Sequence, residues 1–229
     1  DACLAQDRKS RVACETGVTT NFVVNMGEIT CGGWENIDPE KIARQVVREI
    51  GYNREELLFC ADTFEYLCHI HPQSVDISQG VTEGEGLFKE QGAGDQGMMF
   101  GYASDATAQL MPAPIMFSHM LLDELQKLRK NGTIAYLRPD SKSQVSILHV
   151  DGKPREITNV VISHQTDDVS LETIRKDMIE VIQQVLGSTG LLTDRTEYYI
   201  NPTGKFVIGG PHGDAGVTGR KIIVDTYGG

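Results

Sequence analysis

The stretch on which we base the fold reads GKFVIGGPHGDAGVTGRKIIVDTYGG and spans residues 204–229. It holds eight of the chain's 24 glycines. Two apolar runs, residues 206–208 and 222–224, flank the glycines and are typical of strands. Glycine lets the backbone approach a ligand closely, and Asp214, Arg220 and Lys221 lie between the runs. The pattern therefore predicts a strand, an anion-binding loop and a second strand, with an ordinary glycine-rich connection as the alternative.

The composition limits the classes of function. The chain has 229 residues, 40% of them hydrophobic, and a net charge of -11. An acidic surface disfavours binding to nucleic acid or to an anionic membrane, and no apolar run reaches the length of about 18 residues that a membrane span needs. The five cysteines are an odd number without a C-x-x-C pair. Free thiols in a reducing cytoplasm fit this pattern best.

The first 94 residues predict a small α+β unit followed by a loop. Residues 21–30 are typical of a strand. Asp38 and Pro39 are good starting residues for a helix, and Gly51 is a good stop, so we expect a helix over residues 39–50. Residues 80–94 contain five glycines and no periodic apolar face, which indicates a long mobile loop, either a domain boundary or a lid.

The next 110 residues predict a second unit of the same class. We expect a helix over residues 114–130, and strands over residues 133–137, 143–150, 157–163 and 198–200. Asp151-Gly152 is a hairpin signal, and Ser170 can cap a further helix. Helices covering one face of hairpin-connected strands make the fold class α+β.

Several short patterns that resemble nucleotide-binding or metal-binding motifs lack the flanking sequence or the spacing that such sites need. Residues 92–97 match G-x-G-x-x-G, but no apolar strand precedes them and Asp95 would lie where a pyrophosphate should sit. No Walker A motif occurs. Cys68, His69 and His71 do not have the spacing of a two-pair zinc site, so a structural role is favoured. No catalytic Ser/His/Asp arrangement can be defended.

Residues 138–142, RPDSK, are more informative. We place them on a short turn between two strands, with an ordinary surface turn as the alternative. Together with the charges of residues 204–229 they predict a mixed site, in which cations hold phosphate oxygens and carboxylates hold metal, hydroxyl or ammonium groups. The charged residues of this site are Arg138, Asp140, Lys142, Lys205, Asp214, Arg220 and Lys221.

Three runs of the sequence resemble those of a known family. The runs GAGDQGMMFGY (residues 92–102), LRPD (residues 137–140) and GGPHGDAGVTGRK (residues 209–221) are similar to those of S-adenosylmethionine synthetase, also called methionine adenosyltransferase, in its bacterial form. The resemblance covers essentially the whole chain. It implies that the methionine sulfur attacks the 5′ carbon of ATP, and that the released triphosphate is hydrolysed to pyrophosphate and phosphate.

The resemblance also implies ligands and metals. Glu15 resembles the family's potassium ligand, and Glu28, Gln79 and Asp214 resemble its methionine contacts. Magnesium is implied as well, with its ligands mostly outside this chain. The residues that resemble ATP contacts are Asp140, Ser141, Lys142, Lys205, Phe206, Asp214, Arg220 and Lys221. Lys142, Arg220 and Asp95 are the residues that we expect to be catalytic. At position 205 the family usually has arginine, and lysine keeps the charge but lacks the planar fork.

The family implies three similar α+β domains related by pseudo-threefold symmetry, in a homodimer or homotetramer with shared active sites. We expect an N-terminal domain over residues 1–80, a mobile loop over residues 81–94, a central domain over residues 95–206, and the start of a third domain over residues 207–229. The family's upstream His-Pro-Asp-Lys motif and its downstream lysines do not occur in this sequence. We therefore expect a fragment lacking both ends, with little or no activity by itself.

Two other functions remain open at the level of sequence. One is a different Mg-ATP enzyme, such as a kinase or ligase, that uses the same mixed site and releases ADP or AMP. The other is a subunit without catalytic activity that only dimerises with a complete chain.

Overall fold

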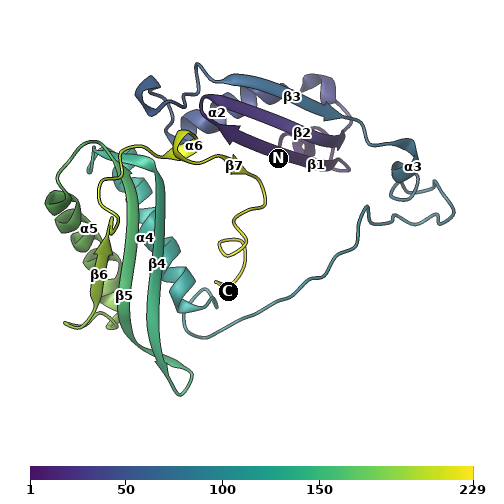
Figure 1. The fold of residues 1–229 in the computed structure, drawn as a ribbon. Helices are drawn as coiled ribbons and strands as arrows, with labels where there is room; N and C mark the ends of the chain where they lie inside the picture. The colour runs from purple at the N-terminus through teal and green to yellow at the C-terminus, as the bar shows by residue number, and fades with distance from the viewer. Residues whose placement is uncertain (229) are drawn as a thin grey trace.

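The computed structural model describes residues 1–228, which form two lobes connected by a long loop and by the C-terminal segment (Figure 1). The first lobe contains α1 (Ala2–Gln6), β1 (Arg11–Thr19), β2 (Phe22–Thr30), η1 (Trp34–Asn36), α2 (Pro39–Ile50), η2 (Glu55–Leu57), β3 (Glu65–His71) and α3 (Val75–Ser78). The second lobe contains α4 (Ala113–Lys130), β4 (Leu137–Val150), β5 (Lys153–Thr166), α5 (Leu171–Leu186), η3 (Gly187–Thr189) and β6 (Glu197–Ile200). The C-terminal segment, residues 201–228, contains α6 (Gly210–Gly213) and β7 (Gly216–Val217).

The two lobes repeat one topology. In the first, β1 and β2 form an antiparallel hairpin, and β3 returns parallel to β2 after α2. In the second, β4 and β5 form the hairpin, and β6 returns parallel to β5 after α5. The sheet orders are β3-β2-β1-β7 and β4-β5-β6. The expected fold class, similar α+β domains with sheets covered by helices, is therefore confirmed.

Local sequence explains the helix ends. Asp38 Oδ1 accepts a hydrogen bond from Lys41 N at 3.0 Å, and Gly51 ends α2 at φ +117°. Ser170 caps α5 in the same way, accepting from Thr173 N at 3.2 Å. Side-chain acceptors satisfy amides that have no partner inside the helix, and left-handed glycine ends a helix without steric cost. These helix predictions are confirmed, including α4 to within one residue.

Each lobe has its own apolar core. The first core joins the inner face of the sheet to α2 through Val23, Val47, Tyr52, Phe59, Ala61 and Phe64. The second core lies between the sheet and the pair of helices α4 and α5, which lie beside the strands in Figure 1. It includes Leu121, Leu125, Ile157, Ile162, Met178 and Ile182. Because the two cores are separate, each lobe is stabilised mainly by its own apolar burial.

The strands expected over residues 206–208 and 222–224 are wrong. The C-terminal segment instead forms the short helix α6 and the two-residue strand β7. Ile208 and Ile222 are 69% and 65% exposed. Asp225 N donates to Lys221 O at 2.9 Å, closing a turn where the second strand was expected. The apolar runs find no sheet edge, whereas Gly216 and Val217 pair with Val18 and Gly17 on the edge of β1.

The turn expected over residues 138–142 is also wrong, because β4 runs without a break from Leu137 to Val150. Its pairing with β5 skips from Leu137 to Ser141. Pro139 explains the skip, since proline has no amide hydrogen to donate and occurs in sheets at edges and irregularities. β4 is an edge strand. Residues 133–136 precede the strand as turns, and β1 and β3 are strands that we did not expect.

The expected loop is confirmed and is longer than predicted. Among the described residues, no helix or strand lies between Ser78 and Ala113, and Figure 1 shows this segment as an extended excursion from α3 to α4. Its mobility stays a prediction. Within residues 1–228, none of the helices combines the length and the apolar character needed to cross a bilayer.

Candidate active site

A cavity of about 840 Å³ lies between α4 and β4. Asp140, Ser141 and Lys142 line it from β4, and Lys221 lines it from the C-terminal segment. Pro114 and Ile115 of α4 supply apolar wall. Ser143 Oγ donates to Ser118 O at 2.8 Å, which joins β4 to α4 beside the cavity. Four residues that we expect to bind ATP therefore meet at one site.

Lys142 and Lys221, the two cations that line the cavity, and Arg220, which precedes Lys221, are unpaired among the described residues, whereas Arg138 pairs with Asp167. Among the described residues, no carboxylate lies within 4.0 Å of Lys142, Arg220 or Lys221, so none of the three forms an ion pair. An uncompensated cation at a cavity favours an anionic ligand. Lys205 differs, because its Nζ lies 2.7 Å from Asp168 Oδ2 and is already paired.

The turn that contains Gly209 and Gly210, called the glycine-rich turn below, is held next to the cavity by close contacts. Gly210 N donates to Asp140 Oδ2 at 2.9 Å. A Cβ at Gly210, where φ is +63°, would lie 2.4 Å from Tyr52 Oη. A Cβ at Gly209 would lie 2.8 Å from the ring of Phe206. The absence of side chains at these two glycines is therefore what lets Tyr52, Phe206 and Asp140 surround the turn.

Tyr52 is a member of this cluster that the sequence did not reveal. Its ring belongs to the core of the first lobe, and its hydroxyl faces the C-terminal segment. Burial, followed by the negative charge of Asp140, raises the pKa of Tyr52 to about 12. The side chain thus stays neutral at physiological pH and acts as a rigid wall beside Gly210.

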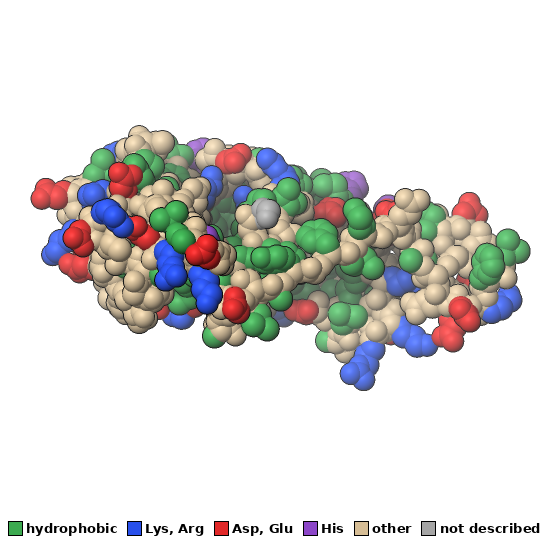
Figure 2. Space-filling model, turned by 90° about the horizontal axis from the view of Figure 1, so that it is seen from below, with side chains coloured by type: hydrophobic (Ala, Val, Ile, Leu, Met, Phe, Trp, Pro, Cys, Tyr) green, Lys and Arg blue, Asp and Glu red, His purple; other side chains and the backbone are tan. Residues whose placement is uncertain are grey.

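The C-terminal segment is anchored to both lobes. Gln165 Nε2 donates to Val207 O at 2.9 Å in the second lobe. In the first lobe, Thr20 Oγ1 and His212 Nδ1 lie 3.0 Å apart, and β7 pairs with β1. Asp214 and Arg220 lie exposed on this segment, on either side of β7. Figure 2, which views the molecule from below the orientation of Figure 1, shows hydrophobic side chains gathered across the middle of the face that it draws.

Glu15 lies on β1 in an oxygen-rich setting. The Thr218 hydroxyl donates to Glu15 Oε2, and Thr16 N donates to Thr218 Oγ1 at 3.1 Å. The structure therefore brings a carboxylate, a hydroxyl and nearby backbone together where a potassium ligand was expected. Thr218 had no signal of its own in the sequence, because only the pairing of β7 with β1 brings it to Glu15.

The other predicted site residues lie away from the large cavity. Glu28, at the end of β2, lies 3.5 Å from His71 Nε2 and lines a separate cavity of about 200 Å³. Gln79 follows α3, and its Nε2 donates to Asp76 O at 3.0 Å. Asp95, in the long loop, accepts from Gln96 N at 2.7 Å. The described chain does not bring these three residues to Lys142.

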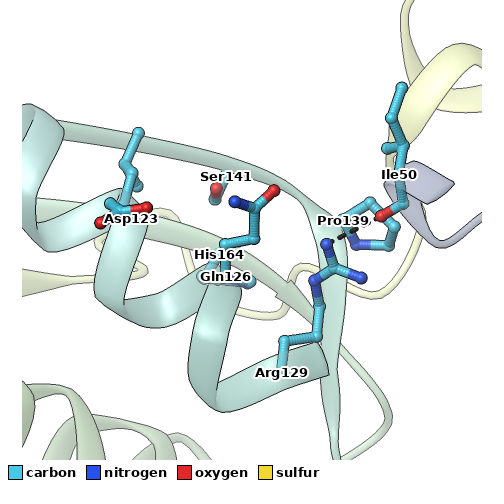
Figure 3. Close-up of a pocket in the computed structure, with 8 residues that line it drawn as sticks. Ile50, Asp123, Gln126, Arg129, Pro139, Ser141 and His164 are labelled. Carbon is cyan, nitrogen blue, oxygen red and sulfur yellow. Dashed lines mark hydrogen bonds between the residues drawn. The ribbon is translucent and has the colours of Figure 1, made fainter. Parts of the chain in front are cut away.

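A third cavity, of about 300 Å³, lies where the two lobes meet (Figure 3). Arg129 Nη2, at the end of α4, donates to Ile50 O at 2.8 Å, which links α4 to α2. Burial lowers the pKa of Arg129. Burial also lowers the pKa of His164, whose Nδ1 donates to Gln165 O at 2.9 Å. Ser141 lines this cavity as well as the large one, so the lobe contact adjoins the candidate site.

The carboxylates of the described residues are not clustered as metal ligands would be. Within residues 1–228, no group of three or more His, Cys, Asp or Glu side chains is placed to hold a metal ion. Cys68, His69 and His71 lie on β3, where neighbouring side chains point to opposite faces. All five cysteines are free thiols.

Comparison with known proteins matches three parts of the chain to the domains of one family. Residues 1–75 match the S-adenosylmethionine synthetase N-terminal domain, residues 90–206 its central domain, and residues 208–229 its C-terminal domain. The S-adenosylmethionine synthase of Akkermansia muciniphila is 56% identical over 237 residues, aligned to 100% of this chain and 59% of its own length. That of Desulfosudis oleivorans is 52% identical over 231 residues, aligned to 100% of this chain and 59% of its own length.

The chain thus spans about three fifths of the length of these curated relatives. The central-domain match alone covers more than half of the chain. The boundaries that we predict at residues 80, 94 and 206 stay predictions. The chain belongs to the S-adenosylmethionine synthetase family.

Proposed function

We propose that this chain forms part of an enzyme that makes S-adenosyl-L-methionine from ATP and L-methionine. The observation that carries the proposal is a pair of lysines, Lys142 and Lys221, that form no ion pair with any described carboxylate and line the same cavity as Asp140 and Ser141. Its volume of about 840 Å³ lies within the range of roughly 300–1,000 Å³ that is usual for small-molecule sites. ATP is a ligand of this size with its negative charge at one end.

The proposed reaction forms one bond and breaks one bond at the same carbon. A lone pair of the methionine sulfur attacks the 5′ carbon of ATP, and the bond from that carbon to the triphosphate oxygen breaks. The triphosphate leaves with the electron pair and is then hydrolysed to pyrophosphate and phosphate. Lys142, Arg220 and Lys221 would stabilise the charge that develops on the leaving group, which is the kind of preorganised electrostatic contact that lowers a barrier most.

The remaining predicted contacts complete the two-substrate site in this proposal. Asp140, Ser141, Phe206 and Lys205 would contact ATP, and Asp214 would contact both substrates. Glu28 and Gln79 would hold methionine, and the long loop would act as a lid that brings Asp95 to the substrates. Since Glu28 and Lys142 line different cavities, sites shared between two copies of the chain are part of the proposal.

The residues present fit the two expected metals in different degrees. Mg²⁺ typically takes one or two carboxylates together with substrate phosphates, so isolated Asp140 and Asp214 suit it better than an all-protein cage. Bound there, magnesium would supply charge neutralisation to the triphosphate. The oxygens of Glu15 and Thr218 suit a hard monovalent cation such as potassium.

Assembly and compartment are further parts of the proposal. The sheet face of β1, β2 and β3 opposite α2 carries Met26 and Leu67, which are 40% and 42% exposed. An apolar sheet face of this kind supports a homodimer or homotetramer. Five free thiols support a reducing cytoplasm.

A chimera tests the function directly. Residues 1–229 replace the aligned segment of the Akkermansia muciniphila relative, and the protein is incubated with Mg-ATP and L-methionine. We expect a sulfonium product together with pyrophosphate and phosphate. Release of ADP or AMP would instead indicate another class of Mg-ATP enzyme. A chimera that assembles but transforms neither substrate would indicate a subunit without catalytic activity.

A further inference from the structure

The 200 Å³ cavity in the first lobe lies where three strand ends meet. Arg11 begins β1 and pairs with Thr30, the last residue of β2. Glu28 pairs with His71, the last residue of β3, and Gln73 follows two residues later. Val81, Gly92 and Gly94 of the long loop form the opposite wall. One end of the first sheet and the long loop thus line a cavity that shares no lining residue with the large cavity.

Two buried polar atoms of residues that line this cavity have no hydrogen-bond partner within residues 1–228. They are Nε of Arg11 and Oε1 of Gln73. Arg11 also forms no ion pair with any described carboxylate, although Glu28 lines the same cavity. A buried donor or acceptor without a partner loses the hydrogen bonds that it makes to water in the unfolded chain, which costs free energy. Native proteins rarely leave such groups unpaired except where something else binds.

The charges of the cavity match one class of ligand. Arg11 offers a planar set of donors suited to a carboxylate. Glu28 and the Gln73 carbonyl oxygen offer acceptors suited to an ammonium group. Val12, Ala13 and Val81 supply an apolar wall. One cation, one anion and a short apolar surface in about 200 Å³ fit the zwitterion of an α-amino acid and are too small for a nucleotide.

We propose that Arg11 and Gln73 are specificity-determining residues for the amino-acid substrate, with Arg11 holding its carboxylate and Gln73 accepting from its ammonium group. The choice of methionine rests on the proposed function, whereas the class of ligand rests on the charges of the cavity. The loop closes this site through close backbone approach. A Cβ at Gly92 would lie 2.2 Å from Gly80 O, so a larger residue there would force the wall apart.

Calorimetric titration of the 229-residue chain tests the proposal, with L-methionine and L-methioninol as probes. Methioninol keeps the ammonium group and the thioether but lacks the carboxylate. We expect Arg11→Gln to raise the Kd of L-methionine roughly tenfold or more, because it removes charge-assisted hydrogen bonds. The same variant should leave the Kd of methioninol unchanged. Arg11→Lys should restore part of the affinity for L-methionine. Gln73→Leu should weaken both probes.

Arg8→Gln is the matched control, because Arg8 is an exposed arginine in the turn before β1 and does not line the cavity. It should leave both Kd values unchanged. Equal weakening of both probes by Arg11→Gln, or no effect on L-methionine, overturns the proposal, as does a wild-type chain that binds neither probe. The proposed function is assayed separately through the sulfonium product of the chimera. An active chimera that is indifferent to Arg11→Gln overturns only the assignment of Arg11.

Discussion

Lys142 and Lys205 show that the surroundings of a lysine decide whether its charge is available to a ligand. Both are lysines that the family resemblance assigns to ATP. Lys142 lines the large cavity and pairs with no described carboxylate, whereas Lys205 is paired with Asp168. We expect Lys142→Ala to slow sulfonium formation by the chimera by roughly 10²-fold, because a preorganised charge on the leaving group is lost. Single-turnover assays, in which the reaction is quenched at set times and the sulfonium product is quantified, measure this rate.

Lys153→Ala is the matched control for Lys142→Ala, since Lys153 begins the neighbouring strand β5 and is exposed. It should react at the wild-type rate. Equal rates for Lys142→Ala and the wild type would remove Lys142 from the proposed machinery.

His164 gives the chain a pH-dependent stability. Burial lowers its pKa from the ordinary 6.5, so below about pH 6.5 the unfolded chain binds more protons than the folded chain. The free energy of unfolding should therefore fall as the pH is lowered through 6.5, and the loss should level off below the pKa of the folded state. His164→Gln should flatten this slope in urea unfolding measured between pH 7.5 and 5.5.

His149→Gln serves for comparison, because His149 is an exposed histidine on β4. It should keep the wild-type slope. If the slopes of all three proteins coincide, His164 is not the titrating group.

At the scale of elements, the glycine-rich turn depends on close contact with Tyr52. Gly210 and Gly190 have similar φ angles of +63° and +69°, but only Gly210 has an atom within 4 Å of its Cβ position. Alanine at Gly190 should cost about 1–2 kcal/mol of backbone strain. Alanine at Gly210 should cost about 1–3 kcal/mol more, because its methyl group overlaps the Tyr52 ring. Urea unfolding curves of the two variants give the difference, which would be near zero if Tyr52 did not confine the turn.

Elements with local signals were predictable from the sequence, and elements that need a distant partner were not. Asp38 and Gly51 fix the ends of α2 by contacts within a few residues. The pairing of β7 depends on the free edge of β1, about 200 residues earlier in the chain. Residues 222–224 have a strand-like composition but no such edge, and they form turns. Pro139 looked like a turn residue because the sequence does not reveal that β4 is an edge strand.

The candidate site divides in the same way. The family resemblance identified Asp140, Lys142 and Lys221, and the fold brings them to one cavity. No sequence pattern identified Tyr52, whose importance arises from its contact with Gly210. Arg11 and Gln73 were likewise invisible, because an unpaired buried atom is a property of packing. The sequence pattern therefore identifies charged motifs, whereas the residues that lie around them become visible only in the folded structure.

At the scale of the whole molecule, two separately packed lobes are held together by a few polar contacts. These include the Arg129 hydrogen bond to Ile50 O and the pair of Arg54 with Asp167, 3.4 Å apart. We expect Arg129→Ala to loosen the lobes, so that scanning calorimetry shows two thermal transitions further apart than in the wild type. Arg175→Ala is the control, because Arg175 donates to Tyr198 O at 2.8 Å within one lobe. Identical profiles for both variants would show that Arg129 does not couple the lobes.

The most direct test of the central claim asks whether the cavity between α4 and β4 receives the triphosphate. The lysines of the chimera are acetylated with and without Mg-ATP, and the extent of modification at each lysine is measured by mass spectrometry. We predict that Mg-ATP protects Lys142 and Lys221 and leaves Lys153 as reactive as before. Equal acetylation of Lys142 and Lys221 in the presence and absence of saturating Mg-ATP would contradict the account.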